Sequence, residues 1–364
     1  MKITRIDTKS LAIPLKTTFK HASAERCVTE TILVMAYSKD IVGYGEGCPR
    51  SYVTGENIES CINFIKSYYQ DIIKLDSVEA IKQFIHVNQA VIDVNPAAWC
   101  AIEIAILDLL GKVDNKSIES MLNIPEIHDN FYYTAVLGIS NPQVFNAQLS
   151  EYIQLGFTDY KLKLSGDIEV DSANIASISA ALPHAKIRLD ANNLWDDANQ
   201  AISYLQDIPQ HFWAIEEPIK VRNYNMIKTL TNQMNYQIIL DESFLQISDL
   251  NYLSDDYRAW IPNIRISKMG GLLRSLAIMQ ECRKLGVKLI MGAQVGETSI
   301  LTRAAISLAN SHRDILLAQE GAFGTHLLEY DIIVSPVMFG KLGALILTPS
   351  NISGLGLKFS FPKH

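Results

Sequence analysis

The sequence predicts an α/β fold, a barrel of eight strand–helix units joined to a separate α+β domain. Three observations support this prediction. First, short apolar segments end in an acid or a lysine at Lys163, Asp190, Glu216, Asp241 and Lys268. Second, the steps between them are 27, 26, 25 and 27 residues, the length that one strand, one helix and two loops need. Third, a chain of 364 residues is too long for one ordinary hydrophobic core, so two domains are expected.

The sequence pattern of the first part of the chain, residues 1–125, predicts the α+β domain. Strands are expected at 3–13, 31–37 and 41–45, where β-branched and aromatic residues alternate with turn residues. Helices are expected at 57–69, 78–91 and 96–112. The last of these has Pro96 at its start and Gly111 at its end, as helices prefer.

Strand and helix alternate in the next part, residues 126–335, which we expect to form the barrel and carry the active site. Its helices include 171–182, 198–206 and 273–285. Eight strands are expected, the number that closes such a barrel: 132–137, 159–164, 186–190, 212–216, 237–241, 263–268, 288–292 and 315–319. Residues 336–364 are punctuated by Gly and Pro, and we expect this segment to return to the first domain.

The composition and the net charge of the chain limit the binding partners and the cellular compartment that we expect. A net charge of −7 argues against nucleic acid and against an anionic membrane surface. There is no secretory h-region at the N-terminus and no apolar run long enough to span a bilayer. Five scattered cysteines without a Cys-x-x-Cys pair favour free thiols in a reducing cytoplasm. The expected partner is a small-molecule substrate, and the sequence leaves a homo-oligomer open.

Asp190, Glu216 and Asp241 end consecutive barrel strands, so their carboxylates are expected at one rim. Three close carboxylates repel one another unless a cation neutralises them. Oxygen ligands without His or Cys suit Mg²⁺ better than Zn²⁺. The alternative is that these acids cap helices or form surface salt bridges.

Lys161 and Lys163 are two residues apart, so on a strand they point to one face, here the barrel interior. Burial beside a second lysine and a cation disfavours the ammonium form, and we expect this to lower a lysine pKa toward the range of a general base. Lys268, from the sixth unit, is expected across the barrel, where it could serve the opposite face of a bound carbon. Salt bridges to the carboxylates are the alternative role.

These motifs resemble those of the enolase superfamily, muconate lactonizing enzyme subgroup. The resemblance rests on Lys-x-Lys, Asp-x-Asn, Glu-Glu-Pro, Asp-Glu-Ser, Lys-x-Gly-Gly and the Gly-Tyr-Gly-Glu-Gly run at 43–47. It implies a modified TIM barrel, (β/α)7β, with an α+β capping domain. It also implies Mg²⁺ on Asp190, Glu216 and Asp241, and Lys163 and Lys268 as the acid/base pair of an enediolate mechanism. Lys161 would tune Lys163 and bind the substrate carboxylate.

Within the subgroup, the segment 53–56 is similar to a segment of the dipeptide epimerases. Their Asp-x-Asp after strand eight is missing here, so Glu320 is the candidate for the dipeptide ammonium group. We expect residues 17–26 to form a capping-domain loop over the barrel mouth. In this loop Ala24 stands where epimerases acting on Ala-Glu carry an arginine, although Arg26 is near. This favours an apolar second residue. The substrate-binding residues that we expect are Thr134, Lys161, Glu297, Glu320, Phe19, Ala24, Tyr52 and Phe323.

The expected function is therefore Mg²⁺-dependent epimerisation of an L,L-dipeptide at its C-terminal residue, by abstraction of the proton α to its carboxylate. Muconate cycloisomerase, o-succinylbenzoate synthase and N-acylamino acid racemase activities use the same first step and remain alternatives. A catalytically silent barrel used for binding is the alternative of another class.

Overall fold

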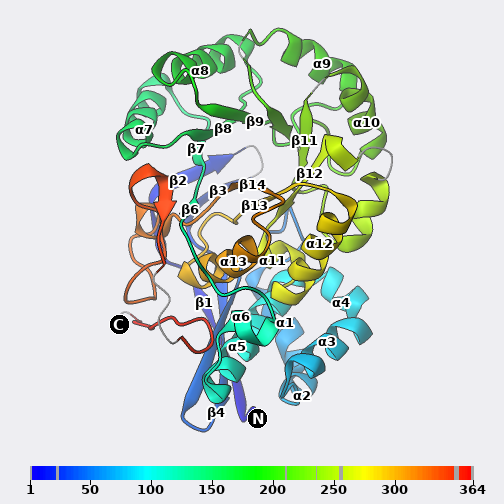
Figure 1. Cartoon of the computed structure of the whole chain (residues 1–364), viewed down its shortest axis with the longest axis vertical. Helices are drawn as coiled ribbons and strands as arrows, with labels where there is room; N and C mark the ends of the chain where they lie inside the picture. Colours follow the sequence, from blue (N-terminus) through cyan, green and yellow to red (C-terminus); the bar gives the residue numbers. More distant parts are fainter. Residues whose placement is uncertain are drawn as a thin grey trace.

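The computed structural model describes residues 2–21, 24–209, 211–234, 236–253, 257–347 and 352–361, and for 19–21, 24, 25 and 258 only the backbone. It has two parts, a parallel eight-stranded sheet curled into a barrel and an N-terminal part with its own sheet and helices (Figure 1). This confirms the predicted fold class. Phe19 and Ala24 belong to the sequence predictions, and their side chains lie outside the described part.

The N-terminal sheet is antiparallel, in the order β1–β4–β5, and its strands are β1 (Arg5–Leu11), β4 (Thr31–Ser38) and β5 (Ile41–Gly47). The helix expected at 78–91 is divided at Asn88, whose φ of −109° and ψ of 21° interrupt the helical backbone. The helices of this part are α1 (Ile58–Ser67), α2 (Tyr69–Ile72), α3 (Val78–Val87), α4 (Gln89–Asp93), α5 (Pro96–Asp114) and α6 (Ile118–Leu122).

Strand β5 packs directly on helix α5 because alternate residues of the strand are glycine. A Cβ atom at Gly43, Gly45 or Gly47 would lie 2.1–2.2 Å from a carbonyl oxygen of α5. The residues met there include Ala101 and Ala105, small residues one helical turn apart. The glycine run that resembles the family motif thus has a packing role, and it fixes Glu46 between the two parts of the chain.

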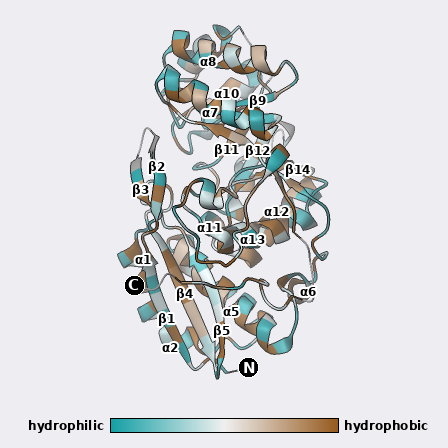
Figure 2. Ribbon diagram, turned by 90° about the vertical axis from the view of Figure 1, so that its left-hand side faces the viewer, coloured by the Kyte–Doolittle hydropathy of each residue, from teal (hydrophilic) through white to brown (hydrophobic). Residues whose placement is uncertain are grey.

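The described residues of the segment expected as a loop, 17–21 and 24–26, instead lie on two paired strands, β2 (Pro14–His21) and β3 (Ala24–Val28). In this hairpin Phe19 pairs with Arg26. The hairpin rises from the N-terminal sheet beside the barrel (Figure 2). Its base is attached to the segment after the last barrel strand, since Lys16 N–H donates to Leu327 O at 2.8 Å. The hairpin therefore reaches the barrel mouth from a fixed base.

The barrel strands follow one another in sequence order, from the first to the eighth. Thr134 N–H donates to Gln319 O at 2.8 Å, which joins the segment before the first strand to the last strand. The sixth strand ends earlier than predicted, and Lys268 lies on the short helix α11 that follows it. The strands are β7 (Ala135–Leu137), β8 (Asp159–Lys163), β9 (Lys186–Asp190), β10 (Ala214–Glu216), β11 (Gln237–Leu240), β12 (Trp260–Ile264), β13 (Leu289–Met291) and β14 (Leu316–Gln319).

Helices cover the outside of the barrel, as Figure 1 shows for α7 to α10 around β7 to β11. Their termini agree with local sequence signals: α7 begins at Pro142 with the Asn141 side chain as its cap and ends at the left-handed Gly156. No described helix is long and apolar enough to cross a membrane. The barrel helices are α7 (Pro142–Leu155), α8 (Ile168–Ala181), α9 (Ala198–Gln206), α10 (Tyr224–Gln233), α11 (Ile266–Met269), α12 (Leu272–Leu285) and α13 (Ser299–Ser311).

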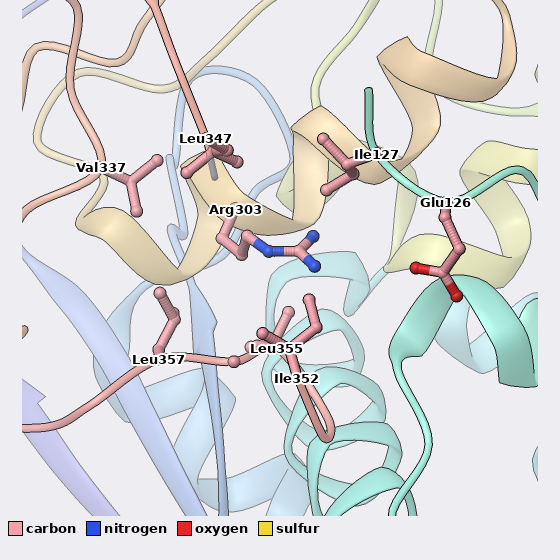
Figure 3. A pocket seen from close by; sticks show the side chains of 9 residues that line it. Glu126, Ile127, Arg303, Val337, Leu347, Ile352, Leu355 and Leu357 are labelled. Carbon is pink, nitrogen blue, oxygen red and sulfur yellow. The ribbon is translucent and has the colours of Figure 1, made fainter. Parts of the chain in front are cut away.

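Buried polar contacts hold the N-terminal part on the barrel. Glu46 accepts hydrogen bonds from Thr298 N–H and Oγ1, the latter at 2.7 Å, and Glu119 forms a two-point ion pair with Arg303 of α13. Arg303 lies beside a small cavity of about 80 Å³ lined mainly by apolar side chains (Figure 3). Such contacts orient the two parts because a buried polar group without a partner is costly.

The C-terminal segment lies against both parts of the chain. Strand β15 (Ala344–Leu345) pairs with β6 (Phe131–Tyr132), which precedes the barrel. Farther on, Phe359 stacks on Tyr44 of the N-terminal sheet, with 3.8 Å between the ring centroids. We therefore keep a division at 1–125, 126–335 and 336–364 as a proposal for the domain organisation.

Candidate active site

The strand register brings Lys163, Asp190 and Glu216 into one layer of the barrel. Lys163 pairs with Asp190 between β8 and β9, and Asp190 pairs with Glu216 between β9 and β10. Asp241 follows the end of the next strand, and all four side chains are buried. The rim predicted from the spacing of these residues thus exists in the fold.

Lys161 lies among the carboxylates. Its Nζ is 2.9 Å from Glu216 Oε2, 3.1 Å from Asp190 Oδ2 and 3.2 Å from Glu320 Oε2. Burial disfavours the ammonium form, but Asp190, Glu216 and Glu320 outweigh burial and raise the pKa of Lys161 above its ordinary value. Lys161 is therefore not the lysine with the lowered pKa that the sequence predicted, because three carboxylates face it.

Lys163 and Lys268 come from opposite sides of the barrel, since β8 and β12 are four strands apart in a sheet of eight. Lys163 Nζ lies 3.2 Å from Asp190 Oδ2 and donates to Asn192 Oδ1 at 2.6 Å. Lys268 Nζ donates to Asp241 Oδ1 at 2.8 Å and to two backbone carbonyls. Burial lowers the pKa of Lys268 despite the nearby Asp241, as a general base requires.

Arg265 also contacts the site, and we did not predict it. Its Nη2 forms an ion pair with Asp241, and its Nη1 donates to Gln294 Oε1 at 2.9 Å. The sequence carries little signal for this role, because Arg265 lies after the end of β12 and its direction depends on the turn into α11.

A second arginine, Arg188, lies beneath the site and holds Glu320. Its Nη2 donates to Glu320 Oε1 at 2.7 Å, and its Nη1 lies 2.5 Å from Asp159 Oδ1. Burial raises the pKa of Glu320, but Lys161 and Arg188 outweigh this and lower it to about 2. Arg188 could have been found from sequence, since it is two residues before Asp190 and so faces the same way.

A cavity of about 530 Å³ opens beside these residues. Five of the candidate site residues line it: Lys161, Lys163, Glu320, Tyr52 and Phe323. The rest of the wall includes apolar and neutral polar residues of the β7–α7 region, Thr17 and Thr18 of the hairpin, and residues 293–295 after β13. It also includes two more charged side chains, Glu242 and Arg265. The cavity is large enough for a small-molecule substrate with one apolar portion.

Two predicted substrate-binding residues, Thr134 and Glu297, do not line this cavity, and neither does the predicted catalytic residue Lys268. The Thr134 hydroxyl is buried and donates to Asp159 Oδ1 at 2.7 Å, and it also accepts from Arg188. The Glu297 carboxylate accepts from the backbone N–H of Gln294 at 2.7 Å. Both residues therefore shape groups next to the cavity, and neither is part of its wall.

The carboxylates have the oxygen chemistry of a hard-cation site, but they are not assembled as one. Within the described ranges, no three acidic, histidine or cysteine side chains are grouped so as to hold an ion as they stand. Lys161 lies between Asp190 and Glu216, and Arg265 pairs with Asp241. Burial, together with Asp190, Glu320 and Asp241, raises the pKa of Glu216 to about 8, even with Lys161 beside it. Additional positive charge would therefore stabilise the ionised carboxylates of this layer, and a divalent cation could supply it.

An eight-stranded barrel with carboxylates and lysines at one rim, under an α+β cap, defines a class of enzyme that removes a proton beside a carboxylate. Family models match nearly the whole chain: the mandelate racemase / muconate lactonizing enzyme N-terminal domain at residues 2–123 and the enolase C-terminal domain-like family at 144–362. The chain belongs to this family of the enolase superfamily.

Among its relatives is a hydrophobic dipeptide epimerase of Enterococcus faecalis, 33% identical over 334 residues, 89% of this chain and 92% of the relative. An L-Ala-D/L-Glu epimerase of Bacillus subtilis is 27% identical over 86% of this chain and 87% of its own. A solved structure of the Enterococcus faecalis dipeptide epimerase, complexed with Mg and L-Leu-L-Tyr, has a TM-score of 0.88 at 29% identity, covering 98% of this chain and 99% of the other.

Proposed function

We propose that this protein is a Mg²⁺-dependent dipeptide epimerase that inverts the α-carbon of the C-terminal residue, with a preference for apolar residues there. The observation that carries the proposal is the pair of buried lysines on opposite sides of the barrel, each in contact with a carboxylate of the same rim. The 33% identical relative is a hydrophobic dipeptide epimerase, which supports this substrate class.

Asp190, Glu216 and Asp241 would hold the Mg²⁺ ion. When bound, the ion supplies positive charge that stabilises the substrate carboxylate as its α-carbon loses a proton. Lys161 and Arg265 now contact these carboxylates and would have to release some of those oxygens. Lys161 would then be available to the substrate carboxylate, since it also lines the cavity.

Lys163 and Lys268 would move the proton. A neutral lysine takes the α-proton from one face, leaving an enediolate, and the protonated lysine opposite delivers a proton to the other face, which inverts the centre. Lys163 lines the cavity and is oriented by Asn192. Lys268 is held by Asp241 and Asn263 O, and burial lowers its pKa, so that its neutral form is accessible.

Glu320 would bind the dipeptide ammonium group. It is an anionic residue of the cavity wall, and Arg188 fixes it from below through Oε1. Phe323, Tyr52 and the apolar wall near β7 would surround the side chains of the dipeptide. Thr134 and Glu297 would act indirectly, through Asp159 and Gln294.

Mass spectrometry of a dipeptide library incubated with the enzyme and Mg²⁺ in D₂O tests this proposal. One deuteron should enter the C-terminal α-position of apolar dipeptides, and an L,D product should form. Deuterium uptake into N-acylamino acids with none into dipeptides would contradict it.

A further inference from the structure

Arg26, on strand β3, is a cation beside the cavity whose charge is already matched. Its Nε lies 2.9 Å from Oε2 of Glu30, four residues later. Its guanidinium carbon lies 5.3 Å from the ring centroid of Tyr52. Because Tyr52 lines the cavity, one aromatic ring separates this cation from the substrate volume.

The two partners differ in their surroundings. The Arg26 side chain is only 9% exposed, whereas the Glu30 side chain is 53% exposed. In the described part of the chain, the buried Nη1 of Arg26 has no hydrogen-bond partner. A guanidinium stays charged in any protein environment and has five N–H donors. A carboxylate brought to this end of the cavity would therefore face a cation behind the Tyr52 ring, whose charge Glu30 already matches.

Glu30 sits on a fixed part of the backbone, whereas Arg26 belongs to the hairpin. The φ of Glu30 is 51°, in the left-handed region that glutamate seldom adopts. Its carbonyl oxygen accepts a hydrogen bond from Arg50 Nη1 at 3.2 Å, and the Arg50 guanidinium also donates to Val295 O at 2.5 Å. Buried Arg50 thus links the Glu30 backbone to the barrel loop after β13, and the ion pair joins the hairpin to this base.

We propose that Glu30 is a specificity-determining residue: by pairing with Arg26 it withdraws the positive charge at the hairpin end of the cavity, so that a dipeptide with an acidic second residue is disfavoured. The inference rests on the function proposed above. It explains how an arginine next to the substrate volume is compatible with an apolar preference. Specificity here comes from a competing charge as well as from attractive contacts.

Glu30→Gln tests this inference, because glutamine keeps the shape of the side chain and removes the competing charge. The measurement is kcat/KM for Ala-Glu and for Ala-Leu in wild type, Glu30→Gln, Arg26→Gln and the double variant. The control is Glu281→Gln, which breaks the surface pair with Lys284 on α12. We expect the Ala-Glu to Ala-Leu ratio to rise about tenfold in Glu30→Gln, a change worth about 1.4 kcal/mol. The ratio should stay at its wild-type value in the control and return close to it in the double variant.

An unchanged ratio in Glu30→Gln overturns the inference, while Ala-Leu epimerisation in the same assay leaves the proposed function standing. An equal loss of kcat/KM for both substrates also overturns it, because the pair would then only hold the hairpin in place. If Glu30→Gln does not fold, Arg26→Gln still decides: a selective gain for Ala-Glu on losing the arginine would contradict the role of the cation. If wild type exchanges the α-proton of neither dipeptide, the proposed function fails, and this inference with it.

Discussion

Lys161 Nζ lies 2.9 Å from Glu216 Oε2 and also contacts Asp190, so one ammonium group bridges carboxylates from adjacent strands. The bridge supplies part of the positive charge in this layer, while burial and the neighbouring carboxylates raise the pKa of Glu216 even with Lys161 beside it. Any cation that binds here must compete with Lys161 for the same oxygens. In the proposed function, metal binding and substrate binding would therefore be linked through this lysine.

The first prediction concerns the metal. Asp241→Asn should weaken Mg²⁺ binding and reduce activity by at least about a hundredfold, because an amide cannot supply the anionic ligand. Titration calorimetry measures the affinity, and circular dichroism checks that the fold is retained. Asp314→Asn, at an exposed pair with Arg283, should change neither. Full wild-type activity in excess EDTA would refute the metal requirement.

The second prediction separates the two lysines. Lys163→Ala and Lys268→Ala should each abolish epimerisation, because one face then has no proton donor or acceptor. Each variant should still exchange the α-proton of the one epimer whose proton faces the remaining lysine. Proton NMR in D₂O, run separately on the L,L and L,D dipeptides, measures this exchange. Wild-type turnover by Lys163→Ala would eliminate the assignment.

The pH profile gives this prediction a second measurement. Burial lowers the pKa of Lys268, so this lysine becomes neutral at a lower pH than an exposed lysine does. The rate for the epimer that Lys268 deprotonates should therefore rise with pH through that lowered value. An acidic optimum with a falling rate above neutrality would argue against a lysine base.

The third prediction concerns Glu320. Glu320→Gln should raise KM for dipeptides about tenfold or more, because a charge-assisted hydrogen bond to the ammonium group is lost. An N-acetylated amino acid has no ammonium group, so any residual turnover of N-acetyl-leucine should be affected far less. Equal losses for both substrates would instead show that Glu320 acts by holding Lys161.

The fourth prediction links stability to pH at the contact between the two parts of the chain. Burial raises the pKa of Glu46 to about 7, although hydrogen bonds from Thr298 oppose the shift. A carboxyl group whose pKa is raised in the folded protein stabilises the fold fully at a pH below its pKa in the unfolded chain. This stability is lost as the pH rises through its pKa in the folded protein. Glu46→Gln stays neutral, so it should remove part of the stability loss between pH 5 and pH 8.

The size of this difference is on the order of 3 kcal/mol, at about 1.4 kcal/mol for each pKa unit. Thermal or urea unfolding of wild type and Glu46→Gln at both pH values measures it. Glu103 is also buried, with a pKa raised to about 7, and it is present in both proteins. The unfolding free energy of Glu46→Gln should therefore still decrease with pH, but less steeply. Exposed Glu151→Gln is the control. Parallel pH profiles for wild type and Glu46→Gln would contradict the prediction.

The barrel and the rim of acids and lysines could be predicted from sequence, because strand periodicity and even spacing are local properties. Lys161, Lys163 and Asp190 face inward for the same reason, and this reasoning extends to Arg188. The direction of Arg265 could not be predicted, because it depends on a turn after β12. The raised pKa of Lys161 depends on Glu320, which is far away in sequence and close only in the folded barrel.

The side-chain environment of the substrate was harder to predict for a related reason. Thr134 and Glu297 were predicted from the resemblance to dipeptide epimerases, but hydrogen bonds to Asp159 and to the Gln294 backbone use their polar groups. Arg26 was predicted to be near the pocket, whereas its partner Glu30 was not considered. Pairings of this kind depend on the hairpin geometry, which the loop expected at 17–26 did not include.

The most direct test of the central claim is the fate of Ala-Leu in D₂O with Mg²⁺, followed by mass spectrometry and chiral chromatography. The account predicts one deuterium at the leucine α-carbon and accumulation of L-Ala-D-Leu. The value of kcat/KM for Ala-Leu should exceed that for Ala-Glu by about tenfold or more. Burying an unpaired carboxylate is costly, whereas burying an apolar side chain is favourable. No deuterium in any dipeptide, or a preference for Ala-Glu, would contradict it.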